Sequence, residues 1–193
     1  MNIALCGAGG TGKGTLAENL VIVYDNLFGL YIPIIRSPAQ DIAKTLYPES
    51  ENFSDIVKDK RLMFQYCGLF SQMYMEKNLF YNDMDYICER SIFDYLAYFN
   101  IGLDDKLEYE KYKSIIKYHY EEYPYDYLYF LGLDFIPADK EKNKWKERDQ
   151  QSREERNKIL REIIFDNNMA YKSVVIDLTG IEDKVKYIID TIR

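Results

Sequence analysis

Residues 2–15 read NIALCGAGGTGKGT, a short apolar run that leads directly into a glycine-rich loop. The apolar residues predict a strand, and glycines let the following backbone turn tightly and direct its N–H groups at anionic oxygens. A helix that begins near Lys13 adds the positive end of its dipole, and the lysine adds a mobile cation. The stretch therefore predicts a strand, a phosphate-binding loop and a helix, in that order.

Two nucleotide-binding motifs fit this loop. Its spacing satisfies G-x-x-x-x-G-K, the P-loop, and also G-x-G-x-x-G, the dinucleotide fingerprint. An arginine after the second strand would suit NADP, and Arg36 ends the apolar run Leu30–Ile35, so an NADP-dependent reductase is a rival interpretation. Lys13 favours the P-loop, because only that motif needs it. The candidate nucleotide-binding residues are Gly7, Gly9, Gly10, Thr11, Gly12, Lys13, Gly14 and Thr15.

Composition limits the partners and the compartment. The 193 residues suit one domain, 1–193, with a full core, and the net charge of -7 makes binding to nucleic acid unlikely. Three cysteines without framework spacing, no apolar run long enough for a membrane and no signal peptide predict a cytoplasmic protein. A small-molecule partner is expected, and a homodimer stays open.

Strand-type runs alternate with helical patterns along the chain. The runs are Asn2–Cys6, Leu30–Ile35, Tyr86–Cys88, Tyr125–Leu131 and Ser173–Leu178. Helical spacing follows the glycine loop and recurs within residues 62–77, 112–123 and 181–192. Such alternation predicts an α/β fold, a P-loop NTPase three-layer sandwich of about five parallel strands with helices on both faces. Ligands bind such sheets at the carboxyl ends of the strands.

The segment 137–161 is rich in Lys, Arg and Glu and poor in apolar residues. Such a charge run is commonly a solvated helix with ion pairs. Beside a phosphate-binding loop, however, a charged helical lid is favoured, because arginines that close over phosphates exclude water from a reacting group. The candidate lid residues are Arg148, Arg153 and Arg156; the last two are three residues apart and are expected to point the same way.

The third predicted strand ends in Cys88-Glu89-Arg90-Ser91. A carboxylate at this edge can hold Mg²⁺ or its waters, and an arginine can neutralise a phosphoryl group. The competing interpretation is an exposed salt bridge of little energetic value. The sole histidine, His119, lies in an apolar stripe and is predicted to be a packed core residue.

The loop resembles that of adenylate kinase and related nucleoside monophosphate kinases, because Gly14 stands where Ser or Thr usually follows the lysine and the hydroxyl comes at Thr15. The resemblance implies that Thr15 contacts a phosphate, with the metal held largely through water. The string Glu89-Arg90-Ser91-x-x-Asp94-x-x-Ala97-Tyr98 resembles segments of deoxyribonucleoside kinases, thymidylate kinases and the P-loop ATPase/kinase group that includes ribosylnicotinamide kinase. This resemblance implies a kinase that uses ATP and Mg²⁺, with Lys13, Glu89, Arg90, Arg148 and Arg153 as catalytic residues.

The same resemblance suggests where the acceptor binds. In thymidylate kinases the second strand ends in R-E-P and its arginine holds the acceptor's monophosphate; here the string is Arg36-Ser37-Pro38. Gln65, Tyr66 and Phe70 lie on the helix that borders the acceptor base in that family, although Tyr66 and Phe70 also fall on a core stripe. Asp94 joins the candidate acceptor-binding residues, and Arg156, Thr179 and Gly180 those for ATP.

These features predict transfer of the γ-phosphoryl of ATP to a small acceptor, a (deoxy)nucleoside monophosphate. Deoxyribonucleoside kinases have a glutamate at the end of the second strand as a base, and none stands there in this chain. Because a phosphate acceptor needs a cation more than a base, Arg36 favours the monophosphate. A nucleoside kinase, for a deoxynucleoside or ribosylnicotinamide, and an ATP-binding regulatory module stay as alternatives.

Overall fold

The computed structural model describes residues 1–50, 56, 58–102, 105–133, 150–166 and 173–192. Its centre is a five-stranded sheet in the order β2-β3-β1-β4-β5, and every pair of neighbouring strands is parallel. The strands are β1 (Asn2–Cys6), β2 (Ile34–Ile35), β3 (Tyr86–Cys88), β4 (Tyr127–Leu131) and β5 (Ser173–Ile176). The predicted α/β sandwich is confirmed, and β1 lies between β3 and β4 with its carboxyl end at the glycine loop.

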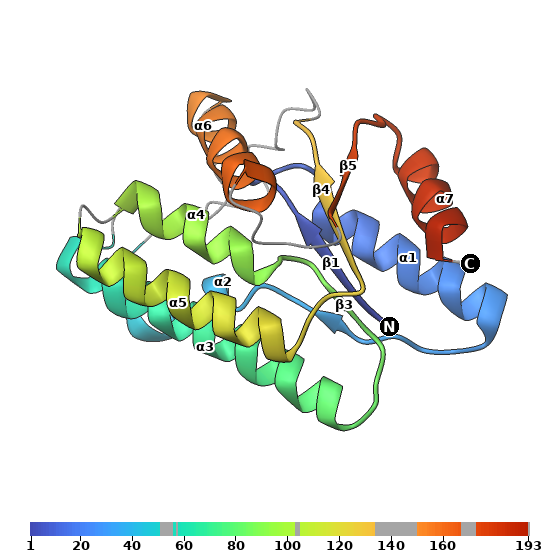
Figure 1. Ribbon diagram of the computed structural model, residues 1–193, viewed down its shortest axis with the longest axis horizontal. Helices are drawn as coiled ribbons and strands as arrows, with labels where there is room; N and C mark the ends of the chain where they lie inside the picture. The colour runs from blue at the N-terminus through green and yellow to red at the C-terminus, as the bar shows by residue number, and fades with distance from the viewer. Residues whose placement is uncertain (51–55, 57, 103–104, 134–149, 167–172, 193) are drawn as a thin grey trace.

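Helices cover both faces of the sheet (Figure 1). On one face pack α1 (Lys13–Phe28) and α7 (Ile181–Ile192), against alternate β1 residues such as Ile3 and Leu5. On the other face lie α3 (Lys58–Tyr81), α4 (Ile92–Gly102), α5 (Lys106–Glu122), α6 (Gln150–Arg161) and the π-helical turn Glu162–Asp166. The short helix α2 (Ala39–Leu46) forms a small cluster of its own with α3. Because side chains alternate along a strand, Ala4 and Cys6 enter the second core.

The second strand is much shorter than its apolar run suggests. Leu30 and Tyr31 are exposed, and pairing with β3 begins only at Ile34. Pro33 lacks an N–H group, so its backbone can accept a hydrogen bond but cannot donate one. Its carbonyl oxygen accepts the Ile87 N–H at 3.0 Å. The prediction of a strand over residues 30–35 was therefore wrong in length, although its carboxyl end and the position of Arg36 were right.

The charged segment contributes a helix that packs against α4. Of the predicted lid, residues 150–161 form α6, whereas residues 137–149, Arg148 among them, lie outside the described residues. Within the described part of the chain, no helix is both long enough and apolar enough to cross a membrane.

Candidate functional site

The loop between β1 and α1 has the backbone geometry that its glycines predict. Gly7, Gly10 and Gly12 have φ values of 147°, 78° and 81°. A side chain at Gly7 would also place its Cβ 2.8 Å from the Leu131 carbonyl oxygen of β4. Gly12 is the N-cap of α1 and no side chain caps the helix, so its first amides are left for an anionic ligand.

Lys13 is turned back over this loop. Its side chain is only 6% exposed, and Nζ donates to the carbonyl oxygens of Gly7 at 2.5 Å and Ala8 at 2.8 Å and to Thr11 Oγ1 at 3.4 Å. Burial lowers the pKa of Lys13, and the nearby Asp94 carboxylate opposes that effect. All three ammonium donors thus have oxygen partners within the loop itself.

The end of β3 brings Glu89 and Arg90 beside the loop. The Glu89 N–H donates to the Ile35 carbonyl at 2.9 Å, and the Glu89 carboxylate faces the first turn of α1, because a Cβ at Gly14 would lie 3.0 Å from Glu89 Oε1. Arg90 lies over the Tyr98 ring, 4.8 Å from its centroid. Burial alone would lower the pKa of Arg90. Tyr98 and Asp94 outweigh that effect and raise the pKa above its ordinary value, so the guanidinium stays charged.

Asp94 joins the loop to the start of α4. Its side chain is fully buried; Oδ1 accepts from the Gly7 N–H at 3.3 Å, and Oδ2 accepts from the Ser91 N–H at 3.0 Å and the Ser91 hydroxyl at 2.8 Å. These contacts make Asp94 a brace between the loop and the Glu89–Ser91 segment. They give no support to the prediction that Asp94 binds the acceptor, and that role stays a prediction.

Two predicted lid arginines, Arg153 and Arg156, reach the site from α6. Arg153 is buried, and its Nε donates to the Gly9 carbonyl at 2.9 Å. The Arg156 guanidinium lies 4.1 Å from the centroid of the Tyr98 ring, the ring that also contacts Arg90. The two side chains of α6 thus contact the glycine loop and Tyr98 respectively, and their predicted action on the phosphoryl group stays a prediction. Arg148 lies outside the described residues.

The turn Thr179–Gly180 lies beside the glycine loop. Gly180 begins α7 by accepting the Lys184 N–H at 3.1 Å, and the next residue, Ile181, comes 3.5 Å from a Cβ placed at Gly12. This position agrees with the predicted contact to the nucleotide, which stays a prediction.

The predicted acceptor residues are distributed over two surfaces. Arg36 is 57% exposed and pairs with Glu18 of α1 at 2.9 Å. Tyr66 stacks on Phe70 and its hydroxyl donates to Glu108 of α5 at 3.2 Å, so this ring faces α5. Gln65 lies one turn before Gly68, where α3 approaches α4 closely: a Cβ at Gly68 would come 2.9 Å from the Tyr95 ring. Among the described residues, the contacts of Gln65 and Tyr66 do not bring them to Arg36, and their role in acceptor binding stays a prediction.

A divalent cation fits the residues at this edge only if it keeps most of its water. Among the described residues, no three His, Cys, Asp or Glu side chains gather into a metal-binding group. One carboxylate, Glu89, faces the turn that carries Thr15, and a single carboxylate with a hydroxyl is a donor set that suits hydrated Mg²⁺.

Two further residues, Tyr98 and Gln72, organise this site and were not predicted from the sequence. Tyr98 contacts both Arg90 and Arg156, and only its place in the quoted string hinted at a role. Gln72 is fully buried on α3 and donates to the Arg90 carbonyl at 2.5 Å. An amide on the buried side of a helix could have indicated a polar contact there, since buried polar groups need partners.

Solved structures share this architecture at low sequence identity. Deoxyadenosine kinase from M. mycoides with dCMP and dCDP bound superposes with a TM-score of 0.68 at 18% identity, over 100% of this chain and 98% of that one. Thymidylate kinase from Ehrlichia chaffeensis gives 0.65 at 16%, over 100% and 98%. NadR protein in complex with NAD and AMP-PNP gives 0.69 at 14%, over 98% of this chain and 48% of that one. No curated protein matches the sequence.

The fold of this chain, a parallel sheet in the order β2-β3-β1-β4-β5 with a glycine loop and its lysine after β1, is similar to that of solved nucleoside and nucleotide kinases. The chain belongs to the AAA domain family, whose model matches residues 2–184.

Proposed function

We propose that this protein transfers the γ-phosphoryl group of ATP to a small nucleotide acceptor, most simply a (deoxy)nucleoside monophosphate. The observation that carries the proposal is the meeting of three groups at one edge of the sheet. They are the glycine loop with its buried Lys13, the Glu89 carboxylate against the first turn of α1, and the Arg90 guanidinium on Tyr98. This set supplies phosphate-binding amides, a mobile cation, a carboxylate and a fixed cation.

Each residue has a distinct part in the proposed reaction. The amides of the loop and the α1 N-terminus bind the phosphate chain, and Lys13 exchanges loop carbonyls for phosphate oxygens. Arg90 and the α6 arginines neutralise the charge on the phosphoryl group during transfer. Thr15 and Glu89 would hold Mg²⁺, which neutralises phosphate charge when bound.

Arg36 supports the monophosphate as acceptor. It follows β2 at the carboxyl edge of the sheet, and its partner Glu18 is itself 52% exposed, so the pair is weak and an incoming phosphate can replace the carboxylate. The second candidate is an unphosphorylated nucleoside; with that acceptor, Arg36 would keep Glu18 as its partner. The two candidates differ in one measurable property, namely which acceptor stimulates ATP consumption.

The experiment is ADP release from ATP and Mg²⁺ in the presence of single nucleosides, ribosylnicotinamide, and ribo- and deoxyribonucleoside monophosphates. Stimulation by one monophosphate is the expected result. Stimulation by a nucleoside alone would replace the proposed acceptor with the second candidate. ADP release that no acceptor changes would contradict transfer and indicate an ATP-hydrolysing regulatory module. NADP binding followed by fluorescence, without competition by ATP, would favour the reductase.

A further inference from the structure

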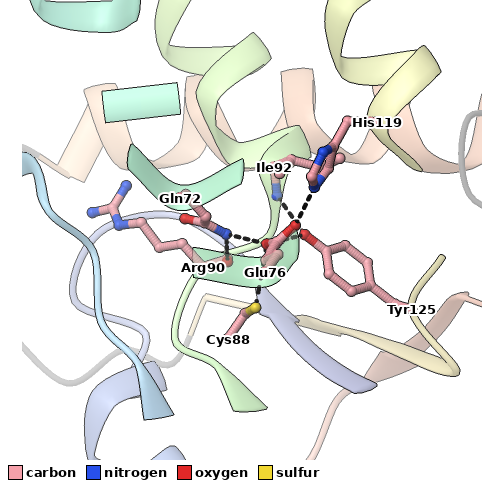
Figure 2. A network of polar contacts seen from close by, with 7 residues as sticks. All are labelled: Gln72, Glu76, Cys88, Arg90, Ile92, His119 and Tyr125. Atoms are coloured by element: carbon pink, nitrogen blue, oxygen red, sulfur yellow. Dashed lines mark hydrogen bonds and ion pairs between the residues drawn. The ribbon is translucent and has the colours of Figure 1, made fainter. Parts of the chain in front are cut away.

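Behind Arg90 lies a buried polar network that the proposed reaction does not use directly (Figure 2). Its centre is Glu76 of α3, which is 0% exposed. Glu76 Oε1 accepts from Gln72 Nε2 at 2.8 Å, from the Tyr125 hydroxyl at 2.7 Å and from the Cys88 thiol at 3.3 Å. Oε2 pairs with His119 Nε2 of α5 at 2.8 Å. The carboxylate is therefore surrounded by four partners from three elements and the segment before β4.

Two members of the network also hold the backbone that follows β3. Gln72 Nε2 donates to the Arg90 carbonyl at 2.5 Å, and the Tyr125 hydroxyl accepts the Ile92 N–H at 3.0 Å. Between them, Asp94 accepts the Ser91 N–H at 3.0 Å. Three consecutive residues are thus each fixed through a backbone group by a different buried side chain.

The donors keep their protons in this environment. Burial raises the pKa of the Tyr125 hydroxyl and of the Cys88 thiol, and the neighbouring Glu76 carboxylate raises both further. A carboxylate buried at this depth is costly unless donors satisfy it, and apolar residues of the same volume commonly stabilise a core at least as well. What apolar residues cannot supply is directional bonding to the Arg90 carbonyl and the Ile92 N–H.

We propose that the Glu76 network positions Arg90 for phosphoryl transfer, with Gln72 and Tyr125 as its positioning residues. The inference rests on the proposed function for its catalytic part, and on the hydrogen bonds alone for its structural part. The Arg90 guanidinium must lie beside the glycine loop to act on the phosphoryl group. A small displacement of the Arg90 backbone would move the guanidinium away from the transferring phosphoryl. Misplacement on this scale reduces the rate of transfer more than the binding of ATP, since Lys13 keeps its bonds to the loop and Asp94 still accepts the Gly7 N–H.

The test compares two Tyr→Phe variants in the full chain. Tyr125→Phe removes the hydroxyl that links Glu76 to Ile92, whereas Tyr123→Phe removes a hydroxyl that donates to Tyr81 at 3.2 Å, away from residues 90–92. We expect Tyr125→Phe to speed hydrogen exchange at the Ile92 amide roughly tenfold, the equivalent of one hydrogen bond. We also expect kcat to fall roughly tenfold with KM for ATP unchanged. Tyr123→Phe should change neither quantity.

Two results would overturn the proposal. One is an unchanged exchange rate at Ile92 in Tyr125→Phe; the other is faster exchange with an unchanged kcat. A wild-type protein without any transfer would instead contradict the proposed function, and the exchange rates would then decide the structural part alone. Gln72→Met is the second variant, should Tyr125→Phe fail to fold, and its expected effects are the same loss of kcat and faster exchange within residues 90–92.

Discussion

Lys13 occupies the centre of the site, and its contacts show how the loop is held without a nucleotide. The ammonium donates to the carbonyl oxygens of Gly7 and Ala8, and the Ala8 oxygen also accepts from the Thr11 hydroxyl at 3.1 Å. Nucleotide binding has to replace some of these oxygens with phosphate oxygens, which carry full negative charge and attract the ammonium more strongly. Lys13 thus supports the loop before binding and neutralises phosphate charge afterwards.

Replacing Lys13 therefore tests the proposed function at one residue. In Lys13→Met the apolar stem is kept and the charge is removed, so we expect the chain to fold and ADP release to fall by about 10²- to 10³-fold. The fold is checked by circular dichroism and by thermal unfolding. Acceptor-stimulated turnover close to that of the wild type would contradict the role assigned to the lysine.

Arg36 offers a second test, with its ion-pair partner as the control. Arg36→Ala should raise KM for a monophosphate acceptor roughly tenfold, the loss expected for a charged hydrogen bond to phosphate. Glu18→Gln frees the guanidinium, so it should leave that KM unchanged or lower it. Both side chains are exposed, and the free energy of unfolding should change by less than about 1 kcal/mol in either variant. An unchanged KM in Arg36→Ala would favour the nucleoside as acceptor.

At the scale of elements, α1 has one glycine in its first turn, Gly14, and another that ends it, Gly29, and the two serve different purposes. Gly29 ends the helix in a left-handed conformation at φ 65°, with its N–H bonded to the Asp25 carbonyl at 2.7 Å. Gly14, in the first turn, has an ordinary helical backbone, and what restricts it is the Glu89 carboxylate, which would lie 3.0 Å from a methyl group added there. The beginning of α1 is thus shaped by the site, and its end by backbone conformation.

Alanine at these two glycines should separate activity from stability. Gly14→Ala displaces the Glu89 carboxylate, so we expect slower transfer and a higher Mg²⁺ requirement, while helix propensity raises the free energy of unfolding by up to about 1 kcal/mol. Gly29→Ala forces an L-residue into the left-handed region and should lower that free energy by about 1 kcal/mol with normal transfer. Urea unfolding and ADP release measure both quantities. Equal activity in both variants would contradict the expectation that displacing the Glu89 carboxylate slows transfer.

Across the whole molecule, local patterns predicted the fold and one edge of the site, because those depend on short-range sequence. Strand β1 and the glycine loop are contiguous, and Glu89 and Arg90 directly follow β3. The network around Glu76 depends instead on α3, α5 and the segment before β4 meeting in space, which no local pattern encodes. The prediction that His119 is a core residue is confirmed, and the ring is buried against Glu76. Its partner could not be predicted, since residues 76 and 119 are distant in the chain.

The two buried cysteines in the central strands make the free energy of unfolding fall as the pH becomes alkaline. Burial raises the pKa of Cys6 and Cys88 well above the ordinary value of 9.0, and the carboxylates of Asp94 and Glu76 respectively add to it. Above about pH 9 the unfolded chain loses these protons while the folded chain keeps them, so the free energy of unfolding falls as pH rises. Lys13 acts in the opposite direction, because burial lowers its pKa and the folded chain releases that proton first. Burial also raises the pKa of tyrosines such as Tyr86 and Tyr125, which acts in the same direction as the cysteines, so the net slope is negative.

We expect the free energy of unfolding to fall by at least about 2 kcal/mol between pH 8 and pH 10. Urea titrations of the reduced protein at these two pH values give the slope directly. Cys6→Ala removes one of the two ionising thiols and leaves Lys13 in place, so its stability should depend less on pH than that of the wild type. A slope unchanged by this substitution would contradict the prediction that the buried Cys6 thiol titrates differently in the folded and unfolded chains.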